Sequence, residues 1–396
     1  MITARAAARL RSGHVWVYRS DLKSEPKPAP VGGLVSVHDE RSHFYGTALY
    51  SSSSQIAIRM LSSEAFPAAD FPSLVRRRVA EAIAYRRRVV RESDAFRVIF
   101  SEADSLPGLI VDRYGDLLTF QVLTQAMDSD AVREAFLQAV IEELQPQAVL
   151  ERVELRIREL EQLPAREGGV VFQRTAGEPK TNTIFTMNGI RFQFDALSGQ
   201  KTGAFLDQRE NYAAAEKYAK GGALDVFCYQ GGFALHLARV CDQVTGVDSS
   251  RAALEVADQN AALNVDSFGG REIEWVEANA FDLLRDYSDS GKRYDTIVLD
   301  PPAFAKTKRN LETAMRGYKE LNLRALKMVN PGGVFVTCSC SFHVGESEFR
   351  EMLSAAAADA KRRLRILEVR GAALDHPHVL SIPETGYLKC VIGAVE

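Results

Sequence analysis

The sequence has no hydrophobic run long enough to cross a membrane and no cysteine pair of the zinc-binding kind. No eighteen consecutive apolar residues occur, and residues 1–11, rich in alanine and arginine, lack the apolar segment of a signal peptide. The five cysteines include no Cys-x-x-Cys pair and no flanking histidine cluster, which argues against a zinc site and a disulfide framework. We therefore expect a cytoplasmic protein with reduced thiols, without membrane association and without a metal.

The chain also lacks a strong net charge. Its formal charge is -3 and its pI is near 6.2, so the whole chain does not have the composition of a nucleic-acid binder, although phosphate affinity depends on a local basic face. A hydrophobic content of 46% and a charged content of 26% are typical of a soluble globular protein. At 396 residues the chain is too long for one core, so we expect two or three domains.

The stretch 224–233 lacks the three glycines, spaced Gly-x-Gly-x-x-Gly, that seat the pyrophosphate of a dinucleotide. It predicts a buried strand, a glycine turn and the start of a helix, followed by a second strand over 243–247 that ends at Asp248. Because Gly231 and Gly232 have no Cβ, a ligand can approach the backbone there, and Asp248 can accept hydrogen bonds from both ribose hydroxyls. With no diphosphate to bind, S-adenosylmethionine is the expected cofactor; an ordinary glycine turn is the alternative.

Short apolar stretches separated by proline, glycine and serine fill residues 1–72 and predict the strands of a small β-barrel. The segment 13–18 resembles part of a PUA domain, a compact RNA-binding barrel. Trp16 and Tyr18 in this segment either pack in the core of the domain or stack on RNA bases. Core packing is the simpler interpretation for each residue.

A helix is predicted over residues 73–91, because its apolar residues fall near one stripe. Its other faces carry arginines that either offer bidentate contacts to phosphates or form an ordinary solvated surface. These are Arg76, Arg77, Arg78, Arg86, Arg87, Arg88 and Arg91.

From about residue 96 the pattern predicts a small α+β domain with one helix over 128–144. In the polar loop between its first strands, Glu102 and Asp104 are too few to indicate a metal site. Residues 154–181 are charged and poor in strand formers, so we expect an exposed excursion there. The predicted strands cover 97–100, 109–113, 117–122 and 148–153.

Polar groups follow the predicted strands of the C-terminal half. The strand over 296–299 ends at Asp300, and two prolines then make a rigid turn at the sheet edge where open α/β sheets bind ligands. A later strand over 334–337 leads into Cys338 and Cys340, which share one face if the strand extends that far. Buried cysteines that act only as small hydrophobic residues are the alternative.

Two further segments are expected to contact the cofactor. The glycine-containing loop over 198–212 can cover its methionine end, where Lys201, Asp207 and Arg209 are candidates to hold the carboxylate and the ammonium group. Asn279, after the third strand, is placed to meet the adenine edge, and Phe281 to stack on the ring.

Taken together, these motifs resemble the bacterial ribosomal RNA large-subunit methyltransferase I family, which methylates C5 of a cytosine in 23S rRNA with S-adenosylmethionine. The resemblance covers nearly the whole chain, from Gly13 to the segment 383–389, but Asn279 stands where the family commonly has aspartate. It implies an α/β protein with an N-terminal PUA-like β-barrel (1–72), a small central α+β domain (73–188) and a C-terminal Rossmann-like class I methyltransferase domain (189–396). The motifs are those over 201–209, 225–233, 300–304 and 339–341.

The family motifs and the strand ends together give a predicted site. Cys340 is expected to act as the nucleophile and Asp300 to orient the base, with Cys338 as the fallback nucleophile. We predict RNA as the partner, either 23S rRNA or a large-subunit precursor, and leave the oligomeric state open, a homodimer included. The predicted cofactor contacts are Gln200, Lys201, Thr202, Phe205, Asp207, Arg209, Asp225, Phe227, Tyr229, Gly231, Gly232, Asp248, Asn279, Ala280, Phe281 and Asp300.

Cytosine C5 is a poor nucleophile, so the expected mechanism has the Cys340 thiolate add to C6 before C5 is methylated. Two other functions remain open. An Asp-Pro-Pro motif followed by an aromatic residue is typical of enzymes that methylate an exocyclic base amine; here the motif is at 300–302, and Phe304 lies one residue later than their spacing requires. Those enzymes need no cysteine. A catalytically inactive RNA-binding assembly factor is the alternative from another class.

Overall fold

The computed structural model describes residues 1–25, 32–197, 204–305 and 308–396. The chain forms two compact units. The first contains Met1–Phe185, Phe194–Lys201 and Leu374–Thr385, and the second contains Thr186–Gln193, Thr202–Ala373 and Gly386–Glu396. The three-domain boundaries expected from the sequence remain a prediction. In the described part of the chain, no helix combines the length and the apolarity needed to cross a bilayer.

The N-terminal part of the first unit is a four-stranded antiparallel sheet with one helix. Its elements are α1 (Ala4–Arg11), β1 (Trp16–Tyr18), β2 (Leu34–His38), β3 (Phe44–Tyr50) and β4 (Ile56–Ser62), in the sheet order β1-β4-β3-β2. The predicted strands are confirmed. Alternate strand residues such as Val17, Val37 and Ala48 pack with Ala6 of α1 into a small core. The indole N–H of Trp16 donates to Glu102 Oε1 at 2.9 Å, so this ring is fixed within the unit.

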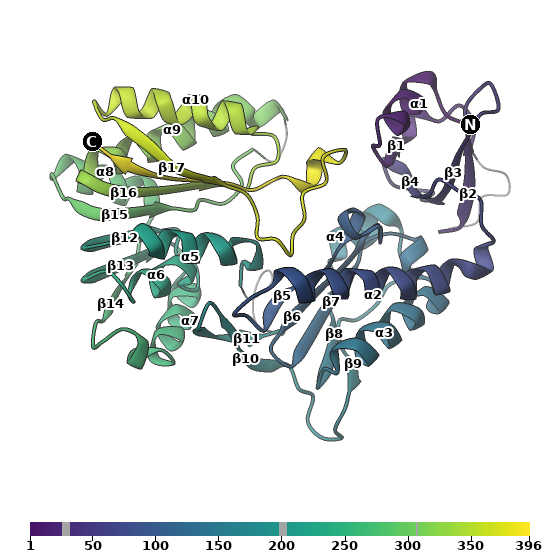
Figure 1. Ribbon diagram of the computed structural model, residues 1–396, viewed down its shortest axis with the longest axis horizontal. Helices are drawn as coiled ribbons and strands as arrows, with labels where there is room; N and C mark the ends of the chain where they lie inside the picture. Colours follow the sequence, from purple (N-terminus) through teal and green to yellow (C-terminus); the bar gives the residue numbers. More distant parts are fainter. Residues whose placement is uncertain (26–31, 198–203, 306–307) are drawn as a thin grey trace. The chain divides into compact units, whose positions relative to one another are not determined.

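A five-stranded sheet with two long helices packed on it forms the largest part of the remainder of the first unit. Its strands run in the order β5-β6-β7-β8-β9, with β7 and β8 parallel and the other pairs antiparallel. The apolar stripe of α2 contributes Val75 and Val79 to a core that also contains Phe136 of α3. The two helices lie side by side (Figure 1). The elements are α2 (Phe71–Val89), β5 (Ala95–Phe100), β6 (Leu109–Tyr114), β7 (Leu117–Val122), α3 (Asp130–Leu144), β8 (Ala148–Glu151), α4 (Leu155–Glu161) and β9 (Gly169–Gln173).

The predicted exposed excursion over 154–181 is wrong, because this segment contributes a helix and a strand. β9 pairs with β8 and completes the sheet. The charged residues that suggested exposure are partly buried in ion pairs: Arg158 contacts Asp128 at 3.0 Å, and Glu161 accepts a hydrogen bond from Ser51. Charge alone did not distinguish a solvated segment from one that carries buried ion pairs.

The arginines of α2 have different partners. Arg86 is 1% exposed and pairs with Asp104, and its guanidinium also donates to the carbonyl oxygens of Arg97 and Asp375. It therefore cannot serve as a phosphate ligand, in contrast to the prediction for the whole arginine set. Arg76 and Arg87 pair with acids of α3.

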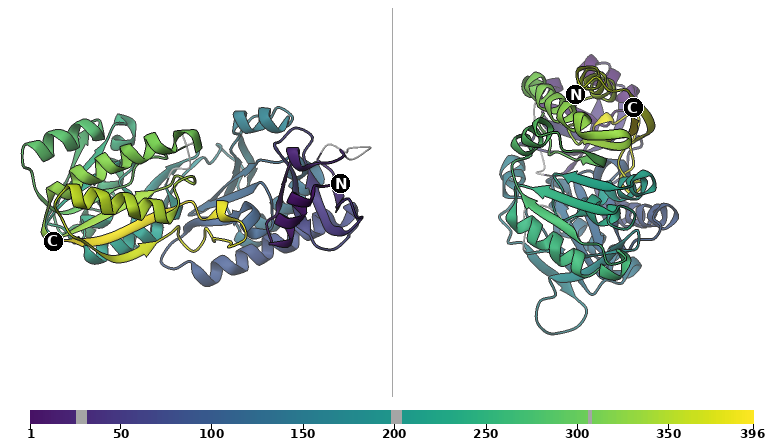
Figure 2. Two further views of the ribbon diagram at one scale, coloured as in Figure 1. Left: turned by 90° about the horizontal axis from the view of Figure 1, so that it is seen from above. Right: turned by 90° about the vertical axis from the view of Figure 1, so that its left-hand side faces the viewer.

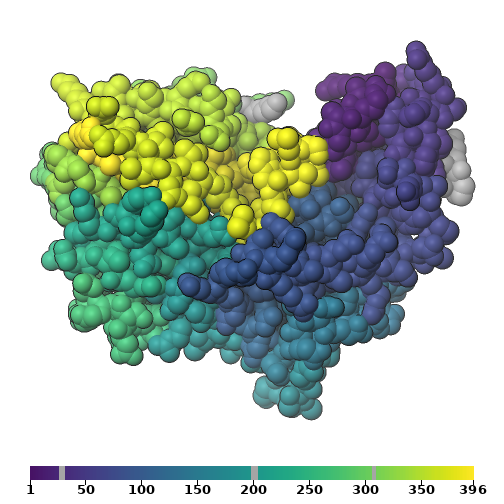
Figure 3. Space-filling view, in the orientation of Figure 1, coloured from purple at the N-terminus to yellow at the C-terminus, as the bar shows by residue number. Residues whose placement is uncertain are grey.

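The segment Leu374–Thr385 belongs to the first unit although its flanks belong to the second. Tyr85 Oη donates to Leu374 O at 2.9 Å, and the backbone N–H of Arg97 donates to Asp375 Oδ2 at 2.8 Å. Figure 3 shows the yellow atoms of this segment against the blue atoms of α2. The first unit is thus completed by residues nearly three hundred positions from α2 in the sequence.

A hairpin leads the chain from the first unit into the second. Its strands are β10 (Asn182–Met187) and β11 (Ile190–Asp195), joined by Asn188 and Gly189. Both turn residues have positive φ, 51° and 78°, as the commonest two-residue hairpin turn requires.

The second unit is built on a seven-stranded sheet in the order β14-β13-β12-β15-β16-β18-β17. β18 runs antiparallel to both of its neighbours, whereas β12 to β16 are parallel. The strand order reverses at β12, which lies between β13 and β15; open α/β sheets bind ligands at such a switch point. The strands are β12 (Gly222–Val226), β13 (Gln243–Asp248), β14 (Ile273–Glu277), β15 (Tyr294–Leu299), β16 (Val329–Ser339), β17 (Leu364–Arg370) and β18 (Lys389–Val395).

Helices cover both faces of this sheet, as Figure 2 shows. One face packs with α8, α9 and α10 into a core that includes Leu224, Ile297 and Phe335. The Rossmann-like arrangement expected from the sequence is confirmed. The helices are α5 (Arg209–Tyr218), α6 (Gly232–Leu237), α7 (Arg251–Ala262), α8 (Ala280–Asp289), α9 (Leu311–Met328) and α10 (Glu346–Asp359).

The buried Arg86 gives a test of the first unit. Arg86→Met leaves the Asp104 carboxylate buried without its partner, so we expect the free energy of unfolding to fall by about 3–5 kcal/mol. Urea unfolding monitored by circular dichroism measures the change. Arg77→Met on the same helix is the control, because Arg77 is exposed and forms a surface ion pair with Glu81 along the helix. Equal effects of the two substitutions would contradict this assignment.

Candidate functional site

The turn after β12 has an unusual backbone. Phe227, Tyr229 and Gly231 have φ of 69°, 49° and 89°. Every second residue of the turn therefore adopts the left-handed backbone conformation. The N–H groups of Phe227 and Cys228 both donate to the carbonyl oxygen of Val247, at 2.8 and 3.0 Å. Each left-handed non-glycine residue costs of order 1–3 kcal/mol and persists only where its surroundings hold it, commonly at functional sites.

The two glycines of this turn have separate structural reasons. A Cβ on Gly232 would lie 2.5 Å from the phenol carbon and oxygen of Tyr212, so this position admits only glycine. Gly231 has positive φ, and a Cβ there would approach Trp275 to 3.1 Å. Both glycines were expected from the sequence to give a ligand access to the backbone. At Gly232 the space is occupied by Tyr212, so packing of this ring also requires glycine there.

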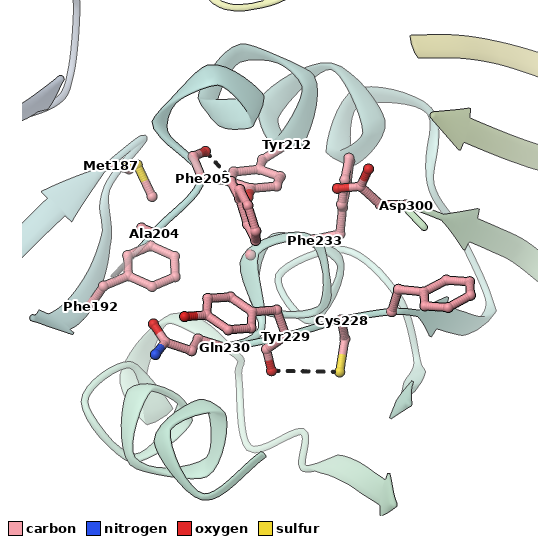
Figure 4. Close-up of a pocket in the computed structure, with 12 residues that line it drawn as sticks. Met187, Phe192, Ala204, Phe205, Tyr212, Cys228, Tyr229, Gln230, Phe233 and Asp300 are labelled. Atoms are coloured by element: carbon pink, nitrogen blue, oxygen red, sulfur yellow. Dashed lines mark hydrogen bonds between the residues drawn. The ribbon is translucent and has the colours of Figure 1, made fainter. Parts of the chain in front are cut away.

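A pocket lies above this turn, within the second unit. Figure 4 shows the rings of Phe205, Tyr212, Tyr229 and Phe233 around it, with the Asp300 carboxyl group on the side away from Phe192. Of the predicted cofactor contacts, Phe205, Phe227, Tyr229, Gly232 and Asp300 line it. Lining residues that sequence reasoning missed are Met187, Phe192, Ala204, Tyr212, Cys228, Gln230 and Phe233.

Buried carboxyl groups stand beside the pocket. Asp225 is fully buried, and its Oδ2 accepts the N–H of Ala234 at 2.8 Å. Its Oδ1 is buried without a hydrogen-bond partner among the described residues. Burial raises the pKa of Asp225 well above its usual range, and the nearby Asp300 and Asp248 charges raise this pKa further. Burial and the Asp207 charge raise the pKa of Asp300 to about 7.

Asp207 is held next to this group from two directions. Tyr387 Oη donates to Asp207 Oδ2 at 2.6 Å, and the N–H of Ala373 donates to the Asp207 carbonyl oxygen at 2.8 Å. Arg209 is buried and pairs with Glu210 at 3.5 Å, and it does not line the pocket. Its predicted contact with the cofactor carboxylate remains a prediction.

Four other predicted contacts lie at the ends of β13 and β14 and do not line the pocket. The Asp248 carboxylate accepts the N–H groups of Tyr229 and Ser250, both at 2.9 Å. Asn279 caps α8, because its Oδ1 accepts the N–H of Phe281 at 2.9 Å. Ala280 is buried, and the ring of Phe281 lies 6.0 Å from that of Phe304. Their roles remain predictions, and the predicted contacts Gln200, Lys201 and Thr202 lie outside the described residues.

Cys340 lies immediately after β16, whose last residue is Ser339, so the strand alternation expected for the two cysteines does not extend to it. Its Sγ is 3.8 Å from the carbonyl oxygen of Pro301, next to Asp300. Burial raises the pKa of the Cys340 thiol to about 11, and the charges of Asp300 and Asp207 contribute. Cys338 is fully buried opposite Cys390 of β18.

The loop after Asp300 is fixed to the chain that carries Cys340. The N–H of Ala305 donates to Ser341 Oγ at 3.2 Å, and Tyr318 Oη lies 2.9 Å from the same oxygen. Tyr318 Oη also accepts a hydrogen bond from Ser339 Oγ at 3.0 Å. These contacts keep Pro301 and Cys340 together.

The residues of the site fit S-adenosylmethionine. Its sulfonium and ammonium groups are cations, and the buried Asp225 and Asp300 carboxyl groups are negative when ionised. The unpartnered Asp225 Oδ1 offers a further hydrogen-bond acceptor. Aromatic rings such as Phe205 and Tyr229 provide apolar surface for the rest of the molecule.

Comparison with known proteins agrees with this site. The sequence model of the PUA-like domain matches residues 1–63, and that of the S-adenosylmethionine-dependent methyltransferases matches residues 160–380. Ribosomal RNA large subunit methyltransferase I from Shewanella frigidimarina is 35% identical over 98% of this chain and 96% of its own. The protein of that name from Shewanella amazonensis is 36% identical over 96% of this chain and 95% of its own.

A solved structure supports the fold. The crystal structure of SMU.776 complexed with SAH has a TM-score of 0.83. It covers 100% of this chain and 99% of its own at 18% identity. The likeness of the two folds extends over both units of the chain.

The contact between Gly232 and Tyr212 predicts the effect of a single methyl group. Gly232→Ala places a Cβ against the Tyr212 ring, so the ring must leave its position in the pocket wall. We expect the affinity for S-adenosylhomocysteine, measured by calorimetry, to fall at least tenfold. Gly371→Ala is the control, because its Cβ would meet only the Leu388 carbonyl oxygen, at 3.7 Å. Unchanged affinity of Gly232→Ala would contradict the importance of this packing.

Asp300 predicts how stability depends on pH. Its pKa is about 7 in the folded protein and near 3.9 in an unfolded chain, so between these values the folded state binds the extra proton. Stability is therefore lost as pH rises from about 4 to 7, by up to about 1.4 kcal/mol per pH unit. Asp300→Asn should make urea unfolding less dependent on pH over this range. The exposed Asp266→Asn is the control, and equal pH slopes for wild type and Asp300→Asn would refute the assignment.

Proposed function

The chain belongs to the family of S-adenosylmethionine-dependent methyltransferases named ribosomal RNA large subunit methyltransferase I, and we propose that it forms 5-methylcytosine in 23S rRNA. The names of the relatives support the RNA substrate. The observation that carries the chemistry is the position of Cys340, whose Sγ lies 3.8 Å from Pro301 O, directly after Asp300. A thiol and a carboxyl group thus lie together at the carboxyl edge of the sheet.

The proposed reaction uses Cys340 as the nucleophile. Its thiolate adds to C6 of the cytosine, which makes C5 nucleophilic. S-adenosylmethionine, when bound, would supply the electrophilic methyl group for C5, and S-adenosylhomocysteine would be the leaving group. C5 then loses its proton, the bond between sulfur and C6 breaks, and Cys340 is regenerated.

Asp300 is the proposed residue that orients the base. Because the pKa of its carboxyl group is about 7, both protonation states are populated near neutral pH. The protonated carboxyl group can donate to N3 of the cytosine, and the ionised group can accept from the N4 amine. A hydrogen bond to N3 withdraws electron density from the ring and so favours addition of the thiolate at C6.

The first unit is proposed to bind the RNA around the target nucleotide. The PUA-like sheet lies in this unit, α2 presents the exposed Arg77 and Arg88, and the exposed Arg91 follows two residues after this helix. The target base must leave any helix it occupies, at a cost of a few kcal/mol, so unpaired or partly assembled rRNA is the favoured substrate.

Substitution of Cys340 tests the covalent mechanism. Cys340→Ala should lower methyl transfer from labelled S-adenosylmethionine to 23S rRNA by roughly 10³-fold or more, because no nucleophile remains to activate C5. In the wild type, 5-fluorocytosine RNA should form a covalent adduct that survives denaturing electrophoresis, because fluorine replaces the C5 proton whose loss would release Cys340 from C6.

The matched variant is Cys338→Ala. It should still form the adduct with 5-fluorocytosine RNA, and mass mapping should show that it methylates the same nucleotide as the wild type. Wild-type activity in Cys340→Ala would favour methylation of an exocyclic amine, since that reaction needs no cysteine. An adduct retained by Cys340→Ala but lost by Cys338→Ala would move the nucleophile to Cys338.

A further inference from the structure

Lys389 is a buried lysine beside the proposed nucleophile. It is the first residue of β18 and lies opposite Ser339 of β16, one residue before Cys340. Lys389 is 6% exposed. Lysine is almost never buried to this extent without a specific partner, because its ammonium group loses its hydration.

The ammonium group of Lys389 is held by carbonyl oxygens. Nζ donates to the carbonyl oxygens of Ser341 and Tyr387, each at 2.7 Å. Among the described residues, the hydrogen-bond partners of Nζ are these two neutral carbonyl groups, and Glu348 acts on the ammonium charge without a hydrogen bond to it. The bond to Ser341 fixes the backbone directly after Cys340.

The charged groups around Cys340 otherwise oppose its ionisation. Burial disfavours a thiolate at Cys340. The negative charges of Asp300, which directly follows β15, and of Asp207, in the turn before α5, disfavour it further. Lys389 is the cation that acts in the opposite direction. Glu348 of α10 also acts on Lys389, and Tyr318 of α9 is affected by the charge of Cys340.

We propose that Lys389 is a positioning residue for Cys340, whose ammonium group fixes the backbone at Ser341 and supplies the positive charge that stabilises the Cys340 thiolate. The inference rests on the proposed role of Cys340 and adds a residue to that site. An opposite charge nearby commonly shifts a pKa by 1–3 units, which is enough to decide how much thiolate is present at neutral pH.

The ammonium group is itself sensitive to pH. Burial lowers the pKa of Lys389 to about 8, and the charges of Cys340 and Glu348 act against this decrease. Below pH 8 the ammonium group is present, and above pH 8 it is progressively lost. The stabilisation of the thiolate should therefore weaken over the range in which the thiol would otherwise begin to ionise.

The rate of Cys340 alkylation by iodoacetamide measures the thiolate without any substrate. In the full-length protein, with the modified peptide quantified by mass spectrometry, Lys389→Met should slow alkylation about tenfold at a fixed pH between 7 and 8. Lys319→Met is the control, because Lys319 is half-exposed and pairs with Asp359 on the surface of the same unit. An unchanged rate in folded Lys389→Met overturns the proposal.

Lys389→Arg gives a second test if the methionine variant does not fold. Arginine keeps its charge at all pH values used, so its logarithmic alkylation rate should rise with unit slope from pH 7 to 9.5. In the wild type the slope should decrease above pH 8, as Lys389 loses its proton. Identical profiles for the wild type and Lys389→Arg overturn the proposal.

The assay also separates this inference from the proposed function. If Cys340→Ala keeps its methyltransferase activity, the nucleophile is wrong, whatever the alkylation rates are. If Cys340→Ala is inactive and Lys389→Met alkylates like the wild type, the nucleophile stands and the role of Lys389 fails. A true positioning role predicts that Lys389→Met lowers kcat about tenfold while the affinity for S-adenosylhomocysteine is unchanged.

Discussion

The turn that follows β12 depends on backbone conformations that non-glycine residues rarely adopt. Phe227 and Tyr229 both have positive φ, at a cost of order 1–3 kcal/mol each. Strand β13 offsets this cost, because Val247 O accepts two N–H groups of the turn and the Asp248 carboxylate accepts a third. The pairing of β12 with β13 therefore fixes the turn that carries Phe227 and Tyr229, two of the residues that line the pocket.

Burial favours the neutral form of the acidic groups in both halves of the site, the carboxyl groups and the thiol alike. It favours the protonated forms of Asp225 and Asp300, so a bound cation such as a sulfonium would stabilise their ionised forms. Burial also favours the neutral thiol of Cys340, and the same carboxylates make a thiolate less stable. A site that binds a cation through buried acids therefore needs a positive charge on the side of its nucleophile, and Lys389 has that charge.

The sequence predicts the parts of this structure that are local in the chain. The strands around Asp225, Asp248 and Asp300 were predicted correctly, because apolar runs followed by turn residues define strand ends. Residues contributed from elsewhere were missed: Phe192 reaches the pocket from the hairpin, and Tyr212 fills the space that Gly232 leaves. No pattern within a segment reveals which distant segment will pack against it.

The burial of Arg86 was missed for the same reason, because helical periodicity places it on a face of α2 but does not identify Asp104 or Asp375 as its partners. The wrong prediction for 154–181 came from treating charge as exposure.

The packing of the loop after Asp300 bears on the choice between a covalent mechanism and methylation of an exocyclic amine. Phe304, the aromatic residue of this loop, packs against Tyr318 with ring centres 4.8 Å apart. Tyr318 in turn contacts Ser339 and Ser341, the two residues that flank Cys340. The aromatic residue is therefore part of the structure that positions the cysteine. An enzyme for exocyclic amines gains nothing from holding a thiol at this place, whereas addition to C6 requires the thiol and the base-orienting carboxyl group to keep a fixed separation.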